Sequence, residues 1–126
     1  MTARSGCILA ISGGVGGAKL ALGLQGIVAP GALTVVVNTG DDFEHLGLAI
    51  SPDIDTALYT LAGVANADLG WGRDGETWHF MAEIERLGGE TWFRLGDKDL
   101  AVHVERTRRL AAGESLESVV SALAAR

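Results

Sequence analysis

Two apolar runs and the glycine-rich segment between them dominate the first forty residues. The run over 7–11 is continuously apolar and breaks into glycines over 13–17, which predicts a strand buried on both faces of a parallel sheet, followed by a tight turn. Leu20 and Leu24 are one helical turn apart, so a helix follows the turn. The β-branched run over 33–37 predicts a second strand. This order is that of a βαβ unit.

Helical spacing dominates the rest of the chain. Ser51 and Pro52 are typical of a helix start and Gly63 of a helix stop, and the apolar residues between them repeat with a helical period. The remaining segments are expected to form a polar loop (38–51), a loop (64–75), a helix (76–87), a strand (91–95), a helix (100–112) and a last helix capped by Ser115.

These elements predict an α/β protein with a Rossmann-like three-layer fold and a mostly parallel sheet. A sheet of three strands leaves open edges, which are unfavourable in water. The last helical pattern runs to Arg126 without a glycine or proline stop. We therefore expect residues 1–126 to be the N-terminal part of a single domain that is truncated on its C-terminal side.

Composition narrows the classes of partner. The chain has 10 Lys and Arg against 16 Asp and Glu residues, a formal net charge of −6, so nonspecific binding to nucleic acid is not expected. Cys7 is the only cysteine, which excludes an intrachain disulfide and favours a cytoplasmic location. No apolar run approaches the ~18 residues of a membrane span, so no membrane partner is expected.

The segment SGGVGGAK over 12–19 is the first candidate site. Its backbone is bare at four positions: Gly13, Gly14, Gly16 and Gly17. Exposed amides at a helix start bind anions such as phosphate, and Lys19 adds a positive charge. Neither the Walker A pattern nor the dinucleotide fingerprint is fulfilled, so we interpret the segment as a phosphate-binding loop of its own type. The alternative is a turn that needs glycine only for packing.

Carboxylates crowd the region after the second predicted strand: Asp41, Asp42, Glu44, Asp53 and Asp55. Two carboxylates ~4 Å apart repel by about 4 kcal/mol at an effective dielectric of ~20, so such a cluster in a cleft favours a bound cation. A magnesium ion that bridges a diphosphate would suit these oxygen ligands. The alternatives are a solvated loop for Asp41 and Asp42, and an acid that stabilises the helix dipole for Asp53.

Cationic and aromatic residues are weaker candidates. Arg94, at the end of a predicted strand, suits an anionic ligand or an acidic partner, or is a charge on an edge strand. Three tryptophans could stack on a planar ligand or belong to the core or an interface: Trp71, Trp78 and Trp92. The histidines lack metal-ligand spacing, so a zinc site is not expected. We interpret one basic cluster as a solvated helix face: Arg106, Arg108 and Arg109.

The candidate loops all follow predicted strands. They cover residues 12–19, 38–51 and 96–99. Because ligands of open parallel sheets bind at the carboxyl ends of the strands, we expect these loops to converge.

Four motifs together resemble the CofD/FbiA family of phospholactate transferases, in particular its actinobacterial members. In order, they are SGGVGGAK (12–19), VNTGDD (37–42), ISPDIDT (50–56) and LGDKD (95–99). The resemblance runs to the end of the chain, although family members are more than twice as long. It implies a transferase of coenzyme F(420) biosynthesis, which moves a phospholactyl or phosphoenolpyruvyl group from a guanosine-diphosphate-linked donor to the deazaflavin Fo and releases GMP. The actinobacterial likeness favours the enolpyruvyl donor.

The resemblance also implies roles for single residues. Asp55 and Arg94 would contact Fo, and Asp42 and Asp55 would hold Mg²⁺. The donor and its phosphates would lie against the glycine loop with Lys19, Asn38 and Thr39. In such a reaction, charge neutralisation and alignment matter more than a covalent nucleophile, and Asp55 could orient or deprotonate the attacking hydroxyl. The expected partners are these small molecules, with a homodimer among the assemblies considered.

Two other functions stay open on the sequence. The chain could be a noncatalytic, truncated nucleotide-binding fragment, because parts of the guanosine pocket in the family come from beyond residue 126. It could also be an NAD(P)-binding Rossmann oxidoreductase in which Asp41 contacts the ribose. Titration with GDP, Fo and NAD, with and without magnesium, separates the three functions.

Overall fold

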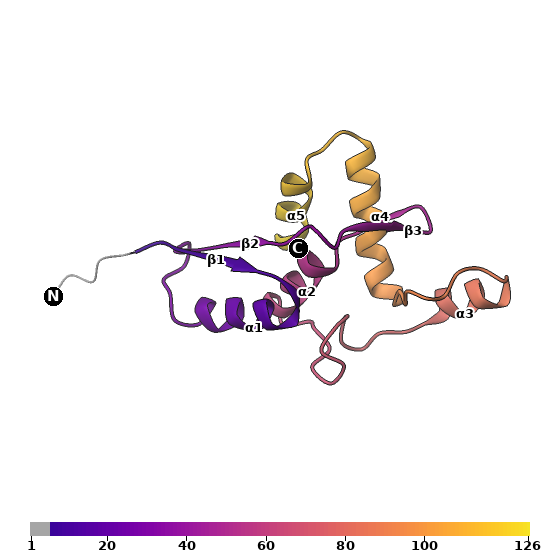
Figure 1. Ribbon diagram of the computed structural model, residues 1–126, viewed down its shortest axis with the longest axis horizontal. Helices are drawn as coiled ribbons and strands as arrows, with labels where there is room; N and C mark the ends of the chain where they lie inside the picture. Colours follow the sequence, from indigo (N-terminus) through magenta and orange to yellow (C-terminus); the bar gives the residue numbers. More distant parts are fainter. Residues whose placement is uncertain (1–5) are drawn as a thin grey trace.

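The βαβ unit predicted for the first forty residues is present in the computed structural model, which describes residues 6–126 (Figure 1). Strands β1 (Ile8–Ser12) and β2 (Leu33–Val37) pair in parallel. Helix α1 (Gly14–Gln25) connects them and packs against both strands. The α/β class and the parallel pairing are therefore confirmed.

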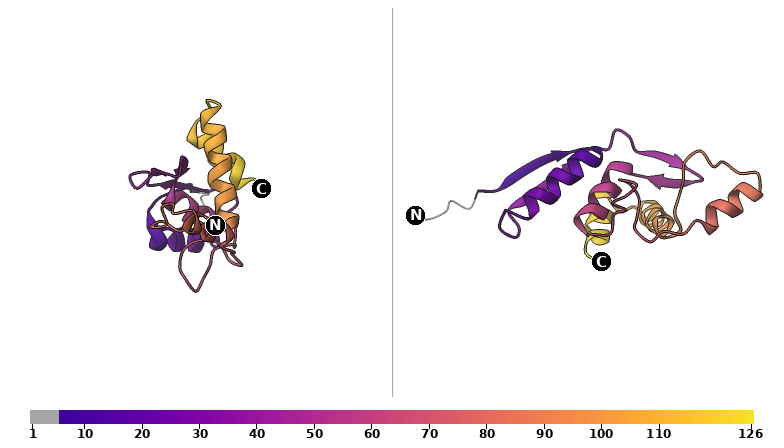
Figure 2. Two further views of the ribbon diagram at one scale, coloured as in Figure 1. Left: turned by 90° about the vertical axis from the view of Figure 1, so that its right-hand side faces the viewer. Right: turned by 90° about the horizontal axis from the view of Figure 1, so that it is seen from below.

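The two-stranded sheet is covered on one face only. Helix α1 lies along this face and packs against α2 (Pro52–Leu61), as seen from below in Figure 2. On the other face, Leu9 is 64% exposed and Ile11 is 83% exposed. The expectation that β1 is buried on both faces is thus wrong for the described residues, because no element covers that second face.

A β-hairpin stands where we expected an irregular polar loop. Strand β3 (Phe43–His45) pairs antiparallel with β4 (Leu48–Ile50). The two turn residues, Leu46 and Gly47, have φ values of 51° and 73°. Two consecutive positive φ values are required by the tight turn that matches the twist of a hairpin.

The helices of the second half agree with the sequence pattern except at some ends. Helix α2 begins at Pro52 as predicted, whereas α3 (His79–Arg86) begins three residues later than predicted and α4 (Asp97–Ala111) three residues earlier. Helix α5 (Leu116–Ala124) starts after Ser115, whose Oγ accepts a hydrogen bond from the Ser118 amide at 3.2 Å, as the expected cap does. Among the described residues, no helix combines the length and the apolar character needed to cross a membrane.

The strand expected over 91–95 does not form. No strand of the described residues pairs with this segment, so its backbone has no ladder to join. Two of its apolar side chains pack into the core instead: Leu95 is buried with Ile50 and Met81, and Phe93 packs against that cluster. Trp92 is 68% exposed. The apolar composition that predicted a strand therefore belongs to a loop anchored in the core.

The N-termini of α3 and α4 are capped by carboxylates from the start of α4 and from the loop before α3. The Asp97 carboxylate accepts hydrogen bonds from the amides of His79 and Phe80 at 3.1 and 3.0 Å. The Glu76 carboxylate accepts from the amides of Lys98 and Asp99 at 2.8 and 3.1 Å. Glu76, which we expected inside a helix, lies in the loop before α3 and satisfies free amides of α4.

The contact between α1 and β1 provides a first prediction. A Cβ on Gly17 would lie 2.5 Å from the Ser12 Oγ and 3.2 Å from its Cα, so Gly17→Ala should lower the free energy of unfolding by about 1–3 kcal/mol. On the same helix, a Cβ on Gly23 would meet no atom within 4 Å, and Gly23→Ala should stabilise the protein by about 0.5–1 kcal/mol. Urea unfolding measures both, and equal effects would contradict this packing.

Candidate functional site

The glycines after β1 have separate structural roles. The turn predicted over 13–17 is wrong, because α1 already begins at Gly14 and only Gly13 precedes it. Gly14 has a φ of 63°, and the space around Gly16 is open, whereas Gly17 is pressed against Ser12. Gly13 brings no side chain that could cap the first-turn amides, so they stay available to an anion. Packing thus accounts for Gly17 but not for Gly14 or Gly16.

Three chain segments meet beside Gly13. The Asn38 side-chain amide donates a hydrogen bond to the Asp53 carboxylate at 3.0 Å, and its Oδ1 accepts from the Gly40 amide at 3.0 Å. A Cβ on Gly13 would lie 3.5 Å from the Asp53 Oδ2. The end of β1, the end of β2 and the start of α2 therefore lie together.

Asp42 has a free carboxylate oxygen next to this meeting point. Its Oδ2 accepts a hydrogen bond from the Ser51 Oγ at 2.9 Å, in place of the expected cap of α2 by Ser51. Its Oδ1 is buried and has no hydrogen-bond partner in the described structure. Thr39 is exposed, and its carbonyl accepts from the Asp42 amide at 3.1 Å. Lys19 is exposed on α1.

A cavity of about 330 Å³ lies between α2, α4 and the loops before and after α3. This volume is within the range of small-molecule sites. Asp55 of α2 and Arg94 of the loop before α4 both line it, together with Tyr59, Trp71, Asp99 and His103. The structure therefore brings to one cavity the two residues that the family resemblance assigned to one substrate.

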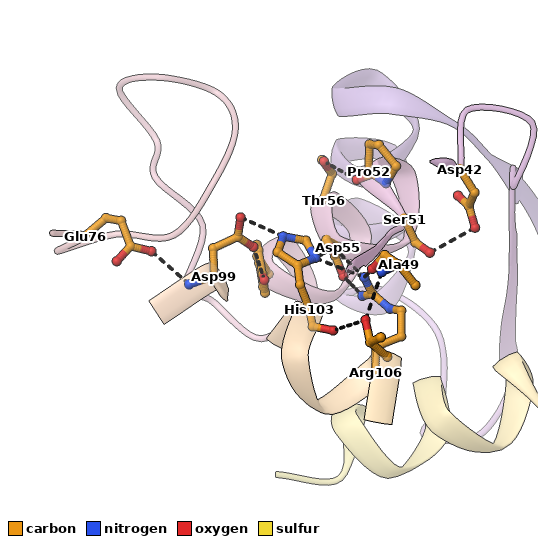
Figure 3. A network of polar contacts seen from close by, with 12 residues as sticks. Asp42, Ala49, Ser51, Pro52, Asp55, Thr56, Glu76, Asp99, His103 and Arg106 are labelled. Atoms are coloured by element: carbon orange, nitrogen blue, oxygen red, sulfur yellow. Dashed lines mark hydrogen bonds and ion pairs between the residues drawn. The ribbon is translucent and has the colours of Figure 1, made fainter. Parts of the chain in front are cut away.

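Asp55 forms a buried ion pair with Arg106. The Arg106 guanidinium donates to both carboxylate oxygens of Asp55 and also to the carbonyl of Ala49 at 3.2 Å (Figure 3). Arg106 is 0% exposed and Asp55 is 5% exposed. The interpretation of Arg106 as part of a solvated basic face is wrong, because α4 turns this side chain toward α2. Arg108, on the same helix, is exposed and pairs with Glu105.

His103 extends the ion pair into a chain of hydrogen bonds. Its Nδ1 is 3.2 Å from an Arg106 nitrogen that can only donate, so Nδ1 is assigned as the acceptor and Nε2 as the protonated nitrogen. Nε2 is 3.0 Å from the Asp99 Oδ2, and the Tyr59 hydroxyl donates to the Asp99 Oδ1 at 2.5 Å. One continuous network thus runs along the cavity wall from Tyr59 to Asp55.

Sequence reasoning missed most of this network. Asp99, His103 and Arg106 stand at positions i, i+4 and i+7, so they share one face of α4. An acid followed by a histidine and an arginine at this helical spacing is the sequence signal that could have predicted the network.

The environment of the cavity shifts the pKa values of three groups. Burial raises the pKa of Asp55, and the charge and hydrogen bond of Arg106 oppose this rise. Burial also raises the pKa of Asp99, but its bonds to His103 and Tyr59 outweigh burial and leave that pKa below its usual value. Burial, followed by the charges of Asp55 and Asp99, raises the pKa of Tyr59 above its usual range. Tyr59 is therefore a neutral donor beside ionised Asp99.

Asp55, Asp99 and His103 form a group whose potential metal-ligand atoms all lie within 4.8 Å of one another. This group contains Asp55 but not Asp42, the other acid assigned to magnesium. Both oxygens of Asp55 already accept from Arg106, whose charge would oppose a cation there. The buried free oxygen of Asp42 meets no such opposition from its hydrogen-bond partner, the Ser51 hydroxyl.

Arg94 and Trp71 line the cavity, and Trp78 packs against both of them. The Arg94 guanidinium lies 4.4 Å from the centre of the Trp78 ring, and Trp78 meets Trp71 edge-on at 6.3 Å. Arg94 lies on a loop instead of the expected strand end, and its described contact is an aromatic face. A cation held against a ring in this way keeps its hydrogen-bond donors at the edge of the plane.

Comparison with known families decides the classification. The model of the family described as 2-phospho-L-lactate transferase CofD matches residues 8–126. The chain belongs to the CofD family. This membership disfavours the oxidoreductase alternative.

Similar proteins come from actinobacteria and are named phosphoenolpyruvate transferase. This CofD-family chain is 47% identical to that of Kitasatospora aureofaciens, 46% to that of Streptomyces avermitilis and 42% to that of Mycobacterium tuberculosis. The matches cover 94%, 92% and 92% of the chain. They cover only 38%, 37% and 39% of the relatives, so the chain spans well under half of their length.

Proposed function

We propose that this CofD-family chain supplies part of the active site of a transferase of coenzyme F(420) biosynthesis. The transferase moves a phosphoenolpyruvyl or phospholactyl group from a guanosine-diphosphate-linked donor to a hydroxyl of the deazaflavin Fo, with release of GMP. The names of the relatives favour the phosphoenolpyruvyl group. The observation that carries the proposal is the presence of Asp55 and Arg94 in one cavity of about 330 Å³.

The donor side of the proposed site is the region around Gly13. The first-turn amides of α1 are not capped by a side chain, and Gly14 and Gly16 leave room for a close approach of phosphate oxygens. Asn38, directly after β2, lies beside Gly13, and we assign the exposed Thr39 and Lys19 to the same donor region. We assign the diphosphate of the donor to this region.

Magnesium fits the free oxygen of Asp42. Carboxylate oxygens are the ligands that Mg²⁺ prefers, and the Asp42 Oδ1 is buried without a partner. Asp42 would thus hold the ion, and Asp55, the second acid assigned to it, would first have to share an oxygen that accepts from Arg106. When bound, the ion neutralises charge on the diphosphate.

The acceptor side is the cavity wall. An Fo hydroxyl beside Asp55 can donate a hydrogen bond to its carboxylate, which orients the hydroxyl for attack and offers a place for its proton. The raised pKa of Asp55 favours this transfer, and Arg106 stabilises the carboxylate before it. Arg94, at the rim, supplies donors to an anionic or carbonyl group of the ligands.

Calorimetric titration tests this assignment. We expect GDP to bind in the presence of magnesium and much more weakly without it, Fo to bind with or without magnesium, and NAD not to bind. Binding of NAD in place of GDP would contradict the proposal and favour an oxidoreductase. Failure of GDP and Fo to bind would favour a noncatalytic fragment.

Asp42→Asn and Asp41→Asn sharpen the same titration. Asp42→Asn should reduce the magnesium-dependent gain in GDP affinity by about tenfold or more, and it should leave Fo affinity unchanged. Asp41 is exposed in the same turn, so Asp41→Asn should leave both affinities unchanged. Equal losses in both variants would point to the net charge of the loop and not to an ion held by Asp42.

Three statements about the whole protein remain predictions. Residues 1–126 are predicted to be the N-terminal part of one longer transferase domain. A homodimer is one of the predicted assemblies, and the predicted location is the cytoplasm. Size-exclusion chromatography with light scattering measures the assembly.

A further inference from the structure

Arg106 is buried more completely than any other charged side chain of the described residues. Its guanidinium extends from α4 to the Asp55 carboxylate of α2 and the Ala49 carbonyl of β4. Its Nε is buried and has no hydrogen-bond partner. Burial of a guanidinium is unfavourable, and apolar side chains of similar volume often fill such a place without loss of stability. The contacts of Arg106 thus suggest a role other than filling space.

The groups that Arg106 holds are on the cavity wall. Asp55 and His103 both line the cavity, and Arg106 contacts both of them. The two donors on Asp55 fix the plane of its carboxylate, because a guanidinium that bonds both oxygens leaves the group no free rotation. His103 in turn holds the Asp99 carboxylate at 3.0 Å.

We propose that Arg106 is a positioning residue for the acceptor substrate: it holds the carboxylates of Asp55 and, through His103, of Asp99 in fixed places on the cavity wall. Two fixed carboxylates select a ligand that presents hydroxyl or N–H donors to both of them. This inference rests on the proposed function, which places Fo in the cavity. It assigns to Arg106 no contact with the substrate.

The test measures Fo affinity by calorimetry in a double-mutant cycle. The variants are Asp55→Asn, Arg106→Gln and the two combined, and Arg106→Lys retains the charge without the two-pronged geometry. Arg108→Gln is the matched control, because Arg108 is a neighbouring arginine of α4 that is exposed and paired with Glu105. Circular dichroism and thermal unfolding give the folded fraction of each variant.

We expect Arg106→Gln to weaken Fo binding about tenfold or more per folded molecule, similar to Asp55→Asn. The loss in the combined variant should be smaller than the sum of the two single losses, because both substitutions remove the fixed Asp55 carboxylate and only the Asp99 part of the Arg106 effect is left to add. Arg106→Lys should lie between the wild type and Arg106→Gln, and Arg108→Gln should bind like the wild type. If Arg106→Gln does not fold, the comparison of Arg106→Lys with Arg108→Gln carries the test.

Two results would overturn the inference while the proposed function stands. In the first, a folded Arg106 variant melts at lower temperature but binds Fo like the wild type, which is the behaviour of a structural ion pair. In the second, the losses of Asp55→Asn and Arg106→Gln add in the combined variant. A wild-type chain that binds no Fo would instead contradict the proposed function, and this inference with it.

Discussion

Replacing Arg106 with methionine is expected to lower the free energy of unfolding by about 3–5 kcal/mol. The substitution leaves the Asp55 carboxylate, which is 5% exposed, without the guanidinium that now bonds both of its oxygens. The Ala49 carbonyl loses a donor at the same time. Urea unfolding followed by circular dichroism measures the change.

Two further variants separate the ion pair from general effects on α4. Asp55→Leu combined with Arg106→Met removes both charges, and its stability should return to within about 1–2 kcal/mol of the wild type. Arg108→Gln removes an exposed charge from the same helix and should leave the unfolding midpoint unchanged. An Arg106→Met protein as stable as the wild type would show that the buried pair is not formed in solution.

Replacing Asp55 with asparagine in a full-length CofD-family protein that contains this chain should reduce turnover by about 10²-fold or more. Asparagine retains the shape of the side chain but cannot accept the proton of an attacking hydroxyl. The affinity for the donor should change little, because the donor is assigned to the region around Gly13. Steady-state kinetics and calorimetry with GDP and magnesium measure the two quantities.

The comparison of these two losses is decisive for Asp55. Equal losses of turnover and of donor affinity would indicate that Asp55 has a structural role only. Loss of its ion pair with Arg106 would then explain both effects. Asp41→Asn serves as the control for charge, since this exposed acid lies outside the cavity lining. It should leave turnover unchanged.

Capping residues and apolar runs predicted those helices and strands that depend on local interactions. Ser51 and Pro52 marked the start of α2, and Ser115 marked the start of α5, because capping and a fixed proline φ act within one turn of helix. The apolar runs of β1 and β2 predicted their parallel pairing through the helix between them. The start of α1 was missed, because glycine is a poor helix former and hides the first turn.

Elements that depend on distant partners were not predictable in this way. The segment 91–95 has the composition of a strand, but its Leu95 and Phe93 side chains pack in the core cluster around Ile50 and Met81. Leu46 takes a positive φ that its residue type does not favour, and it does so inside a hairpin closed by its flanking strands. In both cases tertiary packing outweighs local preference.

In the candidate site too, residues identified from the sequence differ from residues whose place depends on tertiary packing. Asp55 and Arg94 were identified through a family resemblance, and the cavity that they share could not be derived from their spacing. Arg106 was assigned to solvent, because an arginine on a charged helix is usually exposed. Only the docking of α4 against α2 and β4 turns it inward.

The segment that contains α3 protrudes from the rest of the molecule (Figure 1). The capping bonds between the starts of α3 and α4 join the two ends of this segment. The Asp97 amide donates to the Thr77 carbonyl at 2.9 Å, and the Thr77 hydroxyl donates to the Asp97 carboxylate at 2.7 Å, so residues 77 and 97 are joined. Insertions or deletions at the exposed bend Gly88–Gly89 are therefore decoupled from the register of α4. A change of length at this bend is therefore expected to leave Asp99, His103 and Arg106 in place.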